Sequence, residues 1–265
     1  MKINIPPYPN FNITDEAFNR DVASVTVTKK DSQGLSNQLV MVIEFGPGKR
    51  RVIKARPVRF QDNLYVTAFP NPIHLFLSLA IENYNQSEKI KELNFIKCGK
   101  QVGDDVFLLD IEENGTHECY NQYVKYRASS IIMLVSSLEA YLNHIVPNEF
   151  IYSTTRNGKQ VKFNKEDIES TKVSFGEKLN GVIPQWIGKP DFWTTYKKEK
   201  EAIEDLYENR KNIIHLKTNS DDDFTRYFPA IDKMLDLEIL SSINSTIRIM
   251  NVVHPGFVET LHDGS

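Results

Sequence analysis

The chain of 265 residues has few of the features that mark secreted, membrane-bound or disulfide-stabilised proteins. Its two cysteines, Cys98 and Cys119, are too few for a disulfide framework. The N-terminus has no apolar run of the signal-peptide kind. The longest apolar stretch, Ile131–Val135, is far shorter than the ~20 residues that span a bilayer. We therefore expect a soluble cytoplasmic protein without a membrane segment.

The chain also lacks an excess of positive charge and a set of metal ligands. It has 32 Lys and Arg against 35 Asp and Glu, a net charge of −3, so binding of RNA would need a local basic patch. His117 and Cys119 form one close pair of potential zinc ligands, whereas structural zinc sites usually have two such pairs. We expect no metal and no cofactor.

Residues 1–113 predict an α+β domain, because short β-type runs are joined by turns of hairpin length. A helix over Pro72–Gln86 is apolar enough to cover one face of the resulting antiparallel sheet. Pro57 requires an edge or a bulge in its strand, since proline cannot donate to a ladder. The predicted strands are Val22–Thr28, Gln38–Phe45, Lys49–Phe60, Leu64–Phe69, Phe95–Lys97 and Val106–Asp110.

A basic run lies in the third of these strands. Arg50, Lys54 and Arg56 fall on the same face of an extended strand, because alternate residues share a face. Such a stripe can neutralise the phosphates of RNA. The alternative is an ordinary solvated face of the sheet.

Residues 114–265 predict an all-α antiparallel bundle. Apolar residues recur at helical spacing through a long helix over Glu118–Val146. Asn164 has the character of an N-cap residue, since acidic residues follow it in the first turn of a helix. Two more long helices are predicted over Asp191–Lys217 and Pro229–Val253.

The third helix of this part contains an arginine within its apolar stripe. At about 100° per residue, Arg210 falls near the middle of the face formed by Ile203, Leu206, Tyr207, Ile213 and Ile214. Because a guanidinium is costly to bury without partners, Arg210 needs either a carboxylate or an exposed pocket or partner surface. Glu139, at the margin of the stripe of the long helix, is a candidate partner, although an exposed Glu139 is the alternative.

Arg210-Lys-Asn-Ile-Ile-His215 resembles the R-x4-6-H motif of the HEPN superfamily (higher eukaryote and prokaryote nucleotide-binding). Ser136–Asn143 and Ser174–Leu179 resemble the first long helix and the short second helix of that domain. The resemblance covers about residues 118–256 and implies a HEPN-like helical bundle. Many members are metal-independent endoribonucleases of toxin and phage-defence systems, and active members form homodimers with a composite cleft. Possible partners are therefore RNA, a second copy and a protein such as an antitoxin.

The resemblance also implies roles for single residues. His215 would act as general acid and base in attack of a ribose 2′-OH, and Arg210 would stabilise the pentavalent phosphate, giving a 2′,3′-cyclic phosphate. Lys211 stands where the family usually has a polar residue, often Asn, and Asn212 follows one position later. Lys211 would then contact RNA. The alternatives are a non-catalytic interaction or nucleotide-binding module, or a structural Arg210 paired within the bundle beside a His215 that only faces the helix end.

Overall fold

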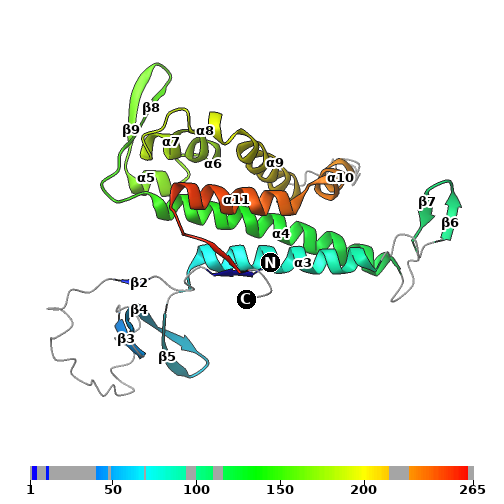
Figure 1. Cartoon of the computed structure of the whole chain (residues 1–265), viewed down its shortest axis with the longest axis horizontal. Helices are drawn as coiled ribbons and strands as arrows, with labels where there is room; N and C mark the ends of the chain where they lie inside the picture. Colours follow the sequence, from blue (N-terminus) through cyan, green and yellow to red (C-terminus); the bar gives the residue numbers. More distant parts are fainter. Residues whose placement is uncertain are drawn as a thin grey trace. The chain divides into compact units, whose positions relative to one another are not determined.

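The computed structural model combines helices with small antiparallel sheets and describes residues 2–4, 10–11, 40–46, 49–68, 70–93, 100–109, 116–214 and 227–261 (Figure 1). The chain divides into two compact units. The helical unit comprises Met1–Asn4 and Phe76–Ser265, and the sheet unit comprises Ile5–Leu75. This division differs from the predicted one after residue 113. The predicted strands over 22–28 and 95–97 lie outside the described residues.

The sheet unit contains the predicted meander. Strands β3 (Val40–Gly46), β4 (Lys49–Phe60) and β5 (Asn63–Ala68) pair antiparallel in chain order, and the short β2 (Asn10–Phe11) also pairs with β4. Pro57 lies opposite Val66 of β5, beyond the point where pairing with β3 ends. Among the described residues, β4 has one neighbour there, and at such an edge a residue without an N–H is tolerated.

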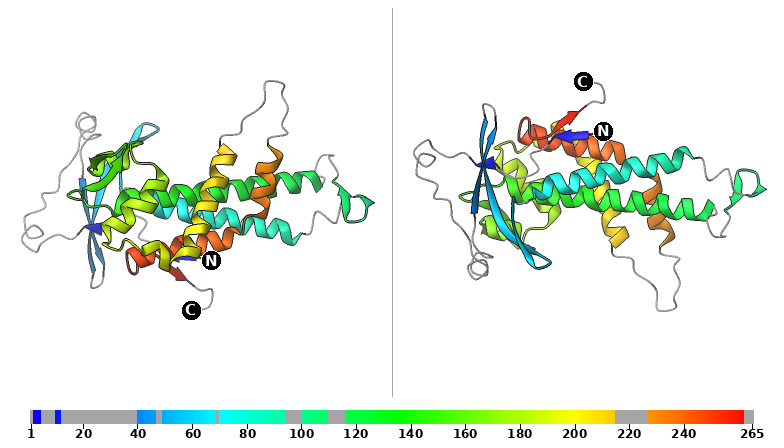
Figure 2. Two further views of the ribbon diagram at one scale, coloured as in Figure 1. Left: turned by 90° about the horizontal axis from the view of Figure 1, so that it is seen from above. Right: turned by 90° about the horizontal axis from the view of Figure 1, so that it is seen from below.

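Two long helices run side by side in the helical unit, α3 (Pro72–Glu92) and α4 (Thr116–Ile145) (Figures 1 and 2). The Ser130 hydroxyl of α4 donates to the Ala80 carbonyl of α3 at 2.8 Å, and both residues are buried. Helix α3 therefore contacts α4 at Ala80, and the boundary between the two units falls at residue 75. The prediction that this helix covers a face of the sheet stays a prediction.

Two of the predicted helices are each divided in two. The segment predicted as one helix from Asp191 forms α8 (Phe192–Thr195) and α9 (Lys197–Ile214). The last predicted helix forms α10 (Phe228–Asp236) and α11 (Ile239–Val253), because Leu237 adopts an extended conformation with ψ of 125°.

Short elements complete the helical unit. A hairpin turns at Asn157-Gly158 with positive φ at both residues, and Asn164 forms the predicted N-cap as part of a capping box. Strand β1 pairs with β10, which the sequence did not predict. The remaining elements are β1 (Lys2–Asn4), β6 (Lys100–Gly103), β7 (Val106–Leu108), β8 (Tyr152–Arg156), β9 (Lys159–Phe163), α5 (Lys165–Glu169), α6 (Phe175–Glu177), a π-helix (Lys178–Val182), α7 (Ile183–Trp186) and β10 (Glu259–Leu261).

Helices α4, α9 and α11 enclose the core of the helical unit. Ile203 and Leu206 of α9 are fully buried, as are Leu134 and Leu138 of α4. The Tyr141 hydroxyl donates to the Met250 carbonyl at 2.9 Å, which ties α4 to the end of α11. This core fixes α9, and thereby the residues of the R-x4-H segment that lie on it.

Candidate functional site

Helix α9 carries the first part of the R-x4-H segment at its C-terminal end. Its buried residues are Glu199, Ile203, Leu206 and Asn209. Arg210 is half-buried at the margin of this face, so the prediction that it occupies the middle was wrong. Tyr207 is half-buried and Ile214 is 43 % exposed, because α4 and α11 cover the side of α9 that contains Leu206 and Asn209.

Arg210 has no carboxylate partner among the described residues. Its Nε is buried and makes no hydrogen bond there. Glu139, the candidate partner, forms no ion pair with Arg210 among the described residues. Burial lowers the pKa of the nearby Lys178, and the Glu139 carboxylate opposes this shift. Arg210 is therefore a half-buried cation with a donor that no described residue uses, and it forms no ion pair with a described carboxylate.

Lys211, Asn212 and His215 follow Arg210 in the motif and differ in their surroundings. The Lys211 ammonium donates to both carboxylate oxygens of Glu208 at 2.9 and 3.1 Å, and this contact raises the pKa of Lys211. Asn212 is half-buried one position later. His215 follows directly after the end of α9 and lies outside the described residues. The structure thus places Arg210, Lys211 and Asn212 on the last turns of one helix.

The segment Ser174–Leu179 contacts both α4 and α9. The Phe175 ring stacks on Tyr207 of α9, with centroids 4.2 Å apart and planes 13° from parallel. The buried Lys178 donates to Asn143 Oδ1 at 2.9 Å. The short segment Ser174–Leu179 therefore bridges α9 and the last turns of α4.

Asn209 was missed by the sequence analysis. It is 9 % exposed, its Nδ2 donates to the Asp205 carbonyl at 2.9 Å, and its Oδ1 is buried without a hydrogen bond. Its position three residues after Leu206 was an available signal, because that spacing places a polar group on the buried face. An unpaired acceptor next to the unpaired donor of Arg210 makes the end of α9 unusually rich in unused polar atoms.

Arg127 is a second buried arginine that the sequence analysis missed. Its guanidinium donates to the carbonyls of Met234, Leu235 and Leu237, where α10 ends. Glu88 of α3 lies 3.9 Å from it. Its place in the stripe of α4, four residues before Ile131, was the available signal. Arg127 caps a helix end, and it joins α3, α4 and α10.

The basic residues of strand β4 lie in the other unit. Arg50, Lys54 and Arg56 occupy register positions opposite Phe45, Met41 and Thr67. The strand is continuous over these register positions, and the shared face of the three residues stays a prediction from the alternation along a strand. Because they belong to the sheet unit and the motif belongs to the helical unit, the two groups are separate features of the chain.

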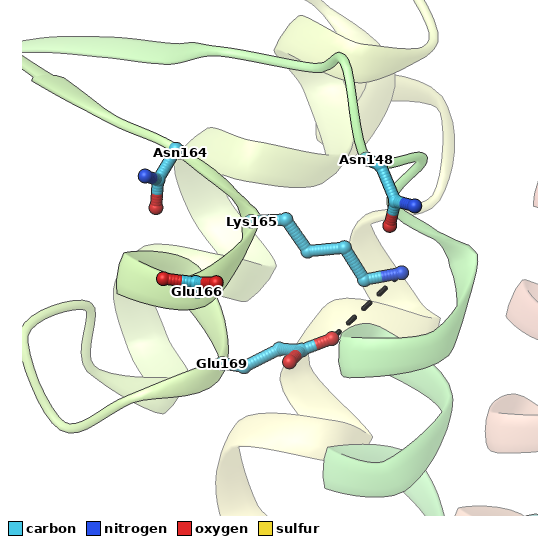
Figure 3. A pocket seen from close by; sticks show the side chains of 5 residues that line it. All are labelled: Asn148, Asn164, Lys165, Glu166 and Glu169. Atoms are coloured by element: carbon cyan, nitrogen blue, oxygen red, sulfur yellow. Dashed lines mark ion pairs between the residues drawn. The ribbon is translucent and has the colours of Figure 1, made fainter.

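A polar pocket of about 430 Å³ lies at α5 (Figure 3). Asn148, Asn164, Lys165, Glu166 and Glu169 line it, and Lys165 pairs with Glu169 at 3.7 Å. None of the predicted site residues contributes to this pocket.

The described residues contain no group of three or more His, Cys, Asp or Glu side chains that could hold a metal ion. Among the described helices, none combines the length and the apolar character needed to cross a bilayer. The chain matches no family model, no curated protein and no solved structure.

Proposed function

We propose that this protein is a metal-independent endoribonuclease of HEPN type. The observation that carries the proposal is the unused donor of Arg210. Because no described carboxylate pairs with Arg210, its guanidinium can bind an anion without first breaking an ion pair with a described residue. The contacts that join Ser174–Leu179 to α4 and α9 agree with the helix order that the family resemblance implies.

In the proposed reaction, His215 removes the proton of a ribose 2′-OH. The 2′ oxygen then forms a bond to the adjacent phosphorus, the bond from phosphorus to the 5′ oxygen breaks, and a histidine returns a proton to that oxygen. Arg210 stabilises the additional negative charge on the pentavalent phosphate. The products carry a 2′,3′-cyclic phosphate and a 5′-hydroxyl.

The site requires a second copy of the chain. If the helix continued through His215, the side chains of Arg210 and His215 would point about 140° apart, so one motif helix would not direct both at the same phosphate. A two-fold dimer with facing motif helices supplies Arg210 from one copy and His215 from the other. RNA is the substrate, and a toxin or phage-defence setting is the context that the resemblance suggests.

One observation favours the alternative, a non-catalytic module that binds a nucleotide or a protein such as an antitoxin. Lys211 is neutralised by Glu208, so the residue after Arg210 is not free to hold a phosphate. A module of this kind predicts binding that depends on Arg210, with no cleavage.

The test is cleavage of a panel of tRNA and single-stranded RNA in EDTA by the wild-type protein and His215→Ala, purified side by side. Cleavage that survives EDTA and disappears in His215→Ala supports the enzyme. Cleavage that persists unchanged in His215→Ala contradicts it. An absence of cleavage by the wild type favours the binding module, which Arg210→Ala would then impair.

A further inference from the structure

The hairpin of β4 and β5 exposes large apolar side chains at its closed end. Phe60 is 64 % exposed, Tyr65 is 51 % exposed and Val58 is 44 % exposed. Val58 lies directly opposite Tyr65, and Phe60 follows Val58 by two residues on the same strand. These three residues therefore share one face of the hairpin. Exposed apolar groups that cluster in this way mark interaction surfaces.

Every aromatic residue in the paired strands β2 to β5 occupies this same face. Phe11 is opposite Val52, Phe45 is opposite Arg50, and Tyr65 is opposite Val58. The even-numbered positions of β4 define this face, and Phe60 is one of them. The odd-numbered positions of β4 and the residues opposite them include no aromatic residue. We call the even-numbered face of the sheet unit the aromatic face.

Arg50, Lys54 and Arg56 occupy even-numbered positions of β4 and so belong to the aromatic face. The six residue steps from Lys54 to Phe60 extend over roughly 20 Å of strand. Basic residues followed by aromatic residues along a strand of this length are suited to a single-stranded nucleic acid, whose phosphates pair with the basic groups and whose unpaired bases stack on the rings. A duplex does not fit this pattern, because its bases are stacked within the helix and present only their edges.

We propose that the aromatic face binds single-stranded RNA. Bases stack on Phe60 and Tyr65, and the basic positions Arg50, Lys54 and Arg56 neutralise phosphates. This inference rests on the proposed function for the choice of RNA, and it adds that the recognised segment is unpaired. It also assigns the sheet unit the task of holding substrate.

The test measures fluorescence anisotropy of a labelled single-stranded RNA 12-mer with the full-length His215→Ala protein, so that binding is read without cleavage. Phe60→Ala and Tyr65→Ala should each weaken binding by about five- to hundredfold, the range for loss of one stacked base. Phe60→Trp should retain affinity. Leu93→Ala is the matched control, because Leu93 is 67 % exposed and lies at the end of α3 in the helical unit, and it should leave affinity unchanged. Lys54→Gln should reduce the slope of log affinity against log salt concentration by about one, the value for loss of one phosphate contact.

Affinities of Phe60→Ala and Tyr65→Ala equal to that of the parent protein would overturn the inference. Equal affinity for the 12-mer and for its duplex would also overturn it. A Phe60→Ala protein that binds RNA normally but loses a self-association seen by ultracentrifugation would assign the face to a protein contact instead. If EDTA-resistant cleavage by the wild type is intact while these variants bind normally, the proposed function stands and only this inference fails. If the wild type shows no cleavage but the variants lose RNA binding, the inference about the aromatic face stands and the proposed nuclease function fails.

Discussion

Arg127 and Arg210 are two arginines of the same helical unit with opposite surroundings. Arg127 is 4 % exposed, and its guanidinium donates to three carbonyls and lies near Glu88. Arg210 is half-buried, has an unpaired buried Nε and has no carboxylate partner among the described residues. Arg127 therefore joins elements of the fold, whereas Arg210 is held in place without being used by it.

This difference between the two arginines suggests that an anion would bind at Arg210 and not at Arg127. An unsatisfied buried donor costs about 1–3 kcal/mol, so the fold would be more stable if Arg210 had a partner or were absent. An anion that reaches the end of α9 relieves that cost at the moment of binding. Arg127 is less suited to bind a ligand, because its Nε and Nη2 already donate to backbone carbonyls.

The largest effect on stability is expected for Arg127→Met. Three carbonyls at the end of α10 would lose their donors, and partial hydration would leave a net loss of about 3–5 kcal/mol in the free energy of unfolding. Urea denaturation followed by circular dichroism measures this loss. A loss below about 1 kcal/mol would show that the carbonyls find other donors and that Arg127 is not a structural clamp.

Arg210→Met is the matched substitution at the other arginine. We expect cleavage to fall by roughly 10²–10³-fold, because the variant cannot stabilise charge on the phosphate. The free energy of unfolding should rise by about 1–3 kcal/mol, since the variant removes a buried donor that has no hydrogen bond among the described residues. A large loss of stability with cleavage preserved would reverse the assignments of the two arginines.

A smaller effect is expected on the pH dependence of the free energy of unfolding when Lys178 is replaced. Burial lowers its pKa from 10.5, so between the lowered value and pH 10.5 the unfolded state binds more protons than the folded state. Stability from this group therefore rises with pH in that window. Lys178→Met should be more stable than the wild type near neutral pH, and the difference should narrow as pH rises toward 10.5.

The control for this measurement is Lys197→Met, at an exposed residue whose only described ion pair is with Glu201 at 3.7 Å. The difference in stability between Lys197→Met and the wild type should stay constant as the pH rises. A constant difference between Lys178→Met and wild type across the alkaline range would contradict the effect of burial on the pKa of Lys178.

The smallest effect is expected for Lys211→Ala. Because Glu208 already neutralises the Lys211 ammonium, cleavage should change by less than about threefold. Glu208→Ala is the informative companion, since it releases the ammonium and should strengthen RNA binding. A loss of cleavage in Lys211→Ala as large as that of Arg210→Met would show that Lys211 leaves Glu208 and contacts the phosphate.

The sequence predicted the elements whose signals are local. The strands β3, β4 and β5, the helix α4 and the Asn164 cap follow from alternation, helical spacing and capping chemistry. The packing of α3 on α4 could not be predicted, because the apolar face of that helix is equally suited to a sheet or a helix. The break at Leu237 was also not predictable, since it is stabilised by Arg127, which is 110 residues away in sequence.

The candidate site was predictable only in part. Helical spacing correctly placed Arg210 near a buried face of α9. Its position at the middle or at the margin of that face depends on how α4 and α11 contact α9, and a shift of one residue along the helix separates the two positions. The absence of a partner for Arg210 Nε depends on the positions of all neighbouring carboxylates, which no local pattern records.

The most direct test of the central claim is the chemical nature of the 3′ ends produced by the wild-type protein in EDTA, with a parallel preparation of His215→Ala. The proposed transesterification predicts 2′,3′-cyclic phosphate ends that mass spectrometry detects in the wild-type reaction and not in the variant. Products with 3′-hydroxyl ends, or the same cyclic phosphate products from both preparations, would contradict it.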